Sequence, residues 1–299
     1  AAELDRARPI VLARIRSRGD VPAQHAFDAL LHDLYDGHPY RWPSVGRAEV
    51  VARLGRDELA AHHAALYRPD RMVLAVSGGV RAAPVFRTAT RLFGSVAAPG
   101  PAAAPAAPAP APRSDRRVLE HPAQQAQILV GFLAPPLSDP DYAAVRVLGT
   151  ALGGGMAGRL FRELRDRQGL AYSVSVLGTY RTGPSFLAAY MGTAPANAAA
   201  AEAGVLRELD RVRREGVTAS ELARARAYLL GTLAMDRRTN ARHAWYLAFF
   251  EVIGAGWDFP ERYARAVEAV TLDDVRRVAE RYLRAPTIVV LLPPGAGPR

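Results

Sequence analysis

The chain has 299 residues, of which 49% are hydrophobic, so the sequence favours a globular protein of two domains. It contains no cysteine, which excludes disulfides, thiolate metal sites and cysteine nucleophiles, and no apolar run reaches the roughly 18 residues of a membrane span. The net charge is +10, but the basic residues are all arginines spread among acidic residues, which argues against nucleic-acid binding.

Residues 1–96 are predicted to be mostly helical. One helix covers the N-terminus. Another opens at Asp57 and runs to Tyr67, and a short apolar strand follows over residues 72–76.

An unusual composition separates this part from the rest of the chain. Residues 97–113 are almost wholly Ala, Pro and Gly, which can form neither a helix nor a strand ladder. We therefore predict an extended linker over residues 97–115 and a second domain over residues 116–299.

The second domain is predicted to mix hairpins with helices. Strands are expected over 118–120, 127–132, 172–180, 185–193 and 288–292, and helices over 142–152, 196–215, from 218 onward and over 273–282. Thr218 and Glu221 have the spacing of a capping box at the start of a helix. Hairpins with segregated helices indicate an α+β fold, in which an antiparallel sheet is backed by helices.

The two parts end alike, which suggests an internal repeat. A helix opening at Asp57 and a strand over 72–76 recur, at the same spacing, as a helix opening at Asp273 and a strand over 288–292. We interpret this as a duplicated domain whose first copy is incomplete, with roughly 100 residues of that copy expected upstream of Ala1.

The most informative segment runs from Gly153 to Val174. A glycine turn opens a helix that stops at Gly169, and a strand carrying Tyr172 follows. Arg165 in the last helical turn and Tyr172 at the strand start could both donate hydrogen bonds to one carbonyl oxygen. On spacing alone, a surface arginine and a half-buried strand tyrosine are the favoured explanation of the pair.

This segment resembles the pitrilysin/insulinase family of zinc metallopeptidases. The match runs through Leu160-Phe161 and Gly169-Leu170-Ala171-Tyr172-Ser173-Val174. The resemblance implies that Arg165 and Tyr172 hold the backbone of a peptide substrate.

The family's metal site, by contrast, is not matched. Its inverted H-x-x-E-H motif is absent, although the chain has seven histidines. The position of the third, acidic ligand corresponds to Arg14, and no Asp or Glu occurs between Asp5 and Asp20. Because an arginine cannot bind zinc, we expect no metal in this chain and zinc in a partner subunit.

The resemblance therefore implies a non-catalytic, substrate-binding subunit, similar to the branch of mitochondrial processing peptidase. Its expected partners are a zinc-bearing homologous subunit, forming a heterodimer, and an unfolded peptide. Two alternatives stay open: an active zinc endopeptidase whose motif lies upstream of Ala1, and a non-enzymatic scaffold like the core subunits of respiratory complexes. Bacterial relatives are often periplasmic, so we expect a periplasmic or secreted protein, with the cytoplasm as the alternative.

Overall fold

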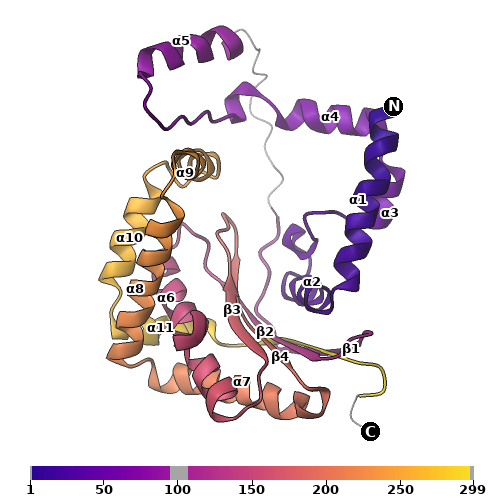
Figure 1. The fold of residues 1–299 in the computed structure, drawn as a ribbon, viewed down its shortest axis with the longest axis vertical. Coiled ribbons are helices and arrows are strands. Elements are labelled where there is room, and N and C mark those ends of the chain that lie inside the picture. Colours follow the sequence, from indigo (N-terminus) through magenta and orange to yellow (C-terminus); the bar gives the residue numbers. More distant parts are fainter. Residues whose placement is uncertain (1, 95–106, 297–299) are drawn as a thin grey trace.

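The structure is a computed structural model that describes residues 2–94 and 107–296 (Figure 1). The first part of the chain is helical, as predicted. Its helices are α1 (Ala2–Asp20), α2 (Pro22–Leu34), α3 (Ala48–Arg53), α4 (Arg56–Leu66) and α5 (Ala82–Phe93). Residues 95–106 lie outside the described part, so the predicted linker is followed only over residues 107–114, which have no regular secondary structure.

The second part contains a five-stranded sheet. Its strands are β1 (Asp115–Glu120), β2 (Ala126–Ala134), β3 (Ser173–Gly178), β4 (Ser185–Thr193) and β5 (Thr287–Leu292). They lie in the order β1-β5-β2-β4-β3; β1 and β5 are parallel, and the other neighbours are antiparallel. β3 is therefore an edge strand.

Helices cover both faces of this sheet (Figure 1). One face packs against α6 (Tyr142–Gly153), α7 (Ala198–Glu215) and α11 (Leu272–Tyr282). Behind them, α8 (Ala219–Asp236), α9 (Asn240–Val252) and α10 (Phe259–Ala269) contribute to the same core. The other face is covered by α2, whose Leu30 packs with Leu129 and Val289. Burial on both faces explains why β2 is a continuous apolar run. The α+β prediction is confirmed.

Two predicted elements differ in the structure. The strand expected over residues 72–76 is extended but pairs with no other strand in the described part of the chain, and Met72 and Leu74 remain exposed. An isolated strand is not stable without a ladder partner. The strand expected over residues 172–180 is shorter, Ser173–Gly178, and the helix before it ends in a π-helical stretch, Phe161–Arg167.

Close packing of α6 against β3 depends on glycine. A Cβ atom at Gly153 would lie 2.5 Å from the backbone nitrogen of Val176. We therefore expect Gly153→Ala to destabilise the protein by about 1–3 kcal/mol, since neither backbone can move without disturbing the core. Urea denaturation measures the change.

Gly231 in the interior of α8 provides the matched control for this substitution. A Cβ atom there would meet nothing within 4 Å. Gly231→Ala should therefore stabilise the protein by about 0.5–1 kcal/mol. Equal midpoints for the two variants would show that the α6–β3 contact is loose in solution.

Candidate functional site

The corner between the π-helix and β3 is fixed by its buried residues. Leu164 is fully buried and packs over Gly204 of α7, where a Cβ atom would lie only 2.8 Å from Leu164. Gly169 has a φ of +64°, a conformation that favours glycine. The Leu170 N–H donates to the Leu164 carbonyl at 2.8 Å and ends the helix. The chain thus turns sharply between Arg165 and the next strand.

Arg165 lies on the outer side of this corner and is exposed. Its Cζ atom is 4.7 Å from the centroid of the Phe161 ring, so the ring supports the guanidinium. In the described part of the chain no carboxylate forms an ion pair with Arg165. The guanidinium donors are therefore available to a ligand.

Tyr172 stands immediately before β3 and is 61% exposed. Its backbone N–H donates to the Gly192 carbonyl of β4 at 2.9 Å, which holds the residue in the plane of the sheet. Arg165 and Tyr172 thus share one corner but do not bond to each other among the described contacts. Their joint action on one carbonyl oxygen remains a prediction.

The predicted degenerate ligand position, Arg14, lies on α1 and is exposed. The residues described in α1 include no buried side chain. Over residues 2–94 and 107–296, no group of three or more His, Cys, Asp or Glu side chains is placed to hold a metal ion. The same part of the chain has no helix long and apolar enough to cross a membrane.

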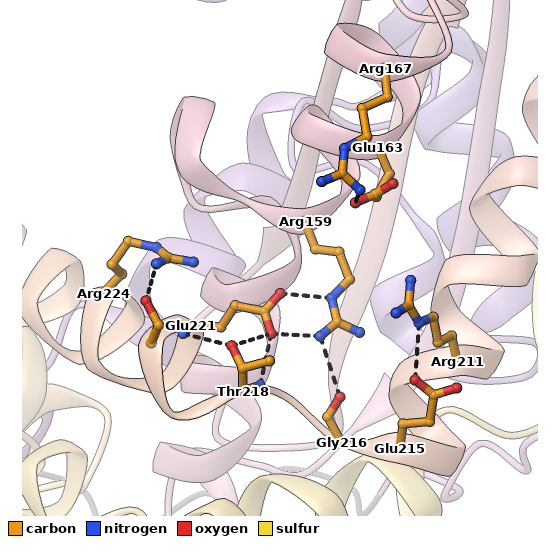
Figure 2. Close-up of polar contacts among 10 residues, drawn as sticks. Arg159, Glu163, Arg167, Arg211, Glu215, Gly216, Thr218, Glu221 and Arg224 are labelled. Atoms are coloured by element: carbon orange, nitrogen blue, oxygen red, sulfur yellow. Dashed lines mark hydrogen bonds and ion pairs between the residues drawn. The ribbon is translucent and has the colours of Figure 1, made fainter.

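A largely buried ion pair lies beside the start of the π-helix that leads into the corner (Figure 2). Arg159, just before the π-helix, donates to both carboxylate oxygens of Glu221 at 2.8 and 2.6 Å, and both side chains are only 11% exposed. Glu221 also accepts from the Thr218 N–H at 2.8 Å, which confirms the predicted capping box. Burial opposes ionisation of Glu221, but the Arg159 and Thr218 donors outweigh it and lower its pKa to about 2.

A cleft of about 500 Å³ opens beside β3, on the face of the sheet that packs against α6. It is lined by β3, α6 and α8, and Arg146 projects into it from α6. Our sequence analysis did not identify this arginine. Its spacing could have identified it, because Arg146, Gly149 and Gly153 recur at intervals of three and four residues and so lie along one face of the helix.

Comparison with known proteins assigns the family. Residues 53–229 match the model of the peptidase M16 inactive domain, and this range includes the corner with Arg165 and Tyr172. A protein of Mycobacterium bovis called an uncharacterized zinc protease is 31% identical over 95% of this chain. The chain belongs to the pitrilysin-type peptidase M16 family. The resemblance predicted from the sequence is confirmed.

The names of other similar proteins include both a protease and a non-peptidase homolog. A Helicobacter pylori protein named non-peptidase homolog YmxG is 22% identical over 82% of this chain and 57% of its own length. The crystal structure of a protease from Helicobacter pylori superposes with a TM-score of 0.88 at 20% identity, over 98% of this chain and 72% of that one. The chain spans 65% of the length of the Mycobacterium bovis relative.

Proposed function

We propose that this M16 chain is a non-catalytic subunit that binds an extended peptide for a zinc-bearing homologous subunit. The observation that carries the proposal is an exposed guanidinium and an exposed phenol, Arg165 and Tyr172, at the start of an edge strand. An edge strand leaves a row of backbone N–H and C=O groups for a peptide to pair with. The two side chains then supply donors to the carbonyl oxygen of the bound peptide.

Among the residues that the structure describes, no group of three or more His, Cys, Asp or Glu side chains could hold a metal ion, which supports this proposal. Arg14 occupies the predicted third-ligand position, and a guanidinium cannot bind a cation. We therefore propose that zinc, its bound water and the general base come from the partner, and that this chain binds and orients the peptide. Preorganised donors at the corner would stabilise the negative charge that develops on the carbonyl oxygen during cleavage.

A reconstitution experiment tests this division of labour. We expect the dialysed chain alone to hold far less than one equivalent of zinc and to cleave no unstructured peptide, because residues 2–94 and 107–296 contain no group of side chains that could hold the metal. Mixed with an H-x-x-E-H homologue from the same genome, it should raise that subunit's cleavage rate. Metal analysis and a fluorescent peptide assay give the two readouts. Stoichiometric zinc in the chain alone would overturn the proposal that zinc comes from the partner.

A non-enzymatic scaffold is the second candidate function. The name of the Helicobacter pylori relative, non-peptidase homolog, favours it. A scaffold would bind its partner without any effect on cleavage. The same reconstitution therefore separates the two functions, because only a substrate-binding subunit changes the rate.

A further inference from the structure

The cleft beside β3 contains a cation that the proposed peptide-binding corner does not use. Arg146 lies on α6 in a stripe with Gly149 and Gly153, the two glycines that let the helix approach the sheet. At the other end of β3, the Nη1 atom of Arg146 would be only 2.9 Å from a Cβ atom on Gly178. The missing side chain of Gly178 thus leaves room for the guanidinium at the end of the edge strand.

Among the described residues, this guanidinium lacks the counterion that a mostly buried arginine normally has. Its Cζ atom is 5.7 Å from the centroid of the Tyr180 ring, and its Nε atom is buried with no hydrogen-bond partner. No carboxylate in the described part of the chain forms an ion pair with Arg146. A charge removed from water without a partner is costly, so a carboxylate brought into the cleft would gain a strong partner.

The remaining charges of the cleft also favour an anion. Asp236 is the acidic residue of the lining, and it already pairs with Arg242 and accepts a hydrogen bond from the Tyr246 hydroxyl at 2.7 Å. Arg238 adds a second positive charge to the lining. The lining of the cleft therefore carries an excess of positive charge.

The geometry of β3 determines how a peptide would reach this cleft. Val174 and Val176 pack into the core on the helix-covered face, and Gly178 continues the same alternation. A strand added to β3 would alternate in the same way, so every second side chain would point toward the cleft. Gly178 follows Tyr172 by about six residues, which is roughly 20 Å along a strand.

We propose that Arg146 forms a specificity subsite for a carboxylate, namely an Asp or Glu side chain of a peptide paired with β3. The acidic residue would lie about six residues along the peptide from the residue held at Arg165 and Tyr172. This inference rests on the proposed peptide-binding function and adds the class of sequence that the subunit selects.

Binding of labelled peptides tests the subsite. The probe is an uncharged, unstructured 16-residue peptide with an amidated C-terminus, in which one Glu is moved along the sequence and compared with Gln at each position by fluorescence anisotropy. We expect one Glu position to bind about 10-fold more tightly than its Gln counterpart, as for a charge-assisted hydrogen bond. Glu at the two adjacent positions should give no gain, because those side chains point to the other face.

Variants of the protein assign the preference to a residue. Arg146→Gln should abolish the Glu preference while the Gln peptide still binds, and Arg146→Lys should retain part of it. Arg265→Gln is the matched control and should leave the preference intact, since Arg265 is an exposed arginine of α10 that does not line the cleft. Thermal unfolding confirms that each variant is folded, and Arg146→Lys keeps the test open if Arg146→Gln is not.

The outcomes separate this inference from the function on which it rests. If wild-type protein binds Glu and Gln peptides equally at every position, or if Arg146→Gln keeps the preference, the subsite is refuted and peptide binding stands. If no peptide binds, both proposals fail. A preference that appears only with a free C-terminal carboxylate would assign the subsite to peptide ends and overturn the side-chain assignment.

Discussion

Glu221→Gln is expected to lower the free energy of unfolding by about 3 kcal/mol, because it leaves the Arg159 guanidinium buried without a counterion. The two side chains form a bidentate pair, and each is only 11% exposed. Glu221 also completes the capping box of α8 with Thr218. The substitution therefore weakens the junction between the π-helix and α8, and urea denaturation at neutral pH measures the loss.

Figure 2 also contains the matched control. Glu215 pairs with Arg211 one helical turn away, but both side chains are more than half exposed. Glu215→Gln removes the same charge and should leave the denaturation midpoint almost unchanged. The double variant Arg159→Met with Glu221→Gln should be more stable than Glu221→Gln alone, since no buried charge is then left unpaired. Equal losses for Glu221→Gln and Glu215→Gln would show that the Arg159–Glu221 pair is solvated.

The same pair predicts how stability depends on pH. The pKa of Glu221 falls from 4.5 to about 2 in the folded protein, so the folded state favours the ionised form. Its contribution is present above about pH 4.5 and is lost as the pH falls toward 2. Wild-type protein should therefore lose more stability than Glu221→Gln over this range.

Local patterns in the sequence predicted most of the sheet and its helices. The strand predicted over residues 185–193 has those bounds in the structure, because its burial and its turn residues agree. Local patterns could not decide whether residues 72–76 form a strand, since a strand needs a hydrogen-bonding partner that is distant in the sequence. The placement of α2 on the far face of the sheet was also not predictable, because it depends on contacts such as Leu30 with Leu129.

The residues of the candidate site also differ in whether the sequence could identify them. Arg165 and Tyr172 could be singled out because they are close in sequence and lie in a recognisable motif. The partner of Glu221 could not be found, because Arg159 is 62 residues away and only the fold joins them. Arg146 was missed because the space for its guanidinium depends on Gly178, which lies on another element. Gly178 has no side chain that would cover the Arg146 guanidinium.

In the reconstituted pair, Arg165→Ala or Tyr172→Phe should lower the rate of peptide cleavage by roughly 10²–10³-fold, equivalent to ~2.7–4 kcal/mol for the loss of one preorganised donor. Both side chains are exposed and make no polar contact with other described residues, so their removal should scarcely change stability. Arg162→Ala provides the control, because Arg162 is an exposed arginine of the same π-helix that lines a pocket together with Arg159 and Glu221.

The kinetic signature decides what the two residues do. Removing a donor that acts on the developing oxyanion lowers kcat, whereas removing a donor that only holds the peptide raises KM and leaves kcat unchanged. We expect kcat to fall for both variants and to stay at the wild-type value for Arg162→Ala. If Arg165→Ala and Tyr172→Phe cleave the peptide at the wild-type rate, the corner has no role in catalysis. A scaffold would then be the better account of this chain, because its edge strand and its exposed arginine would serve only assembly.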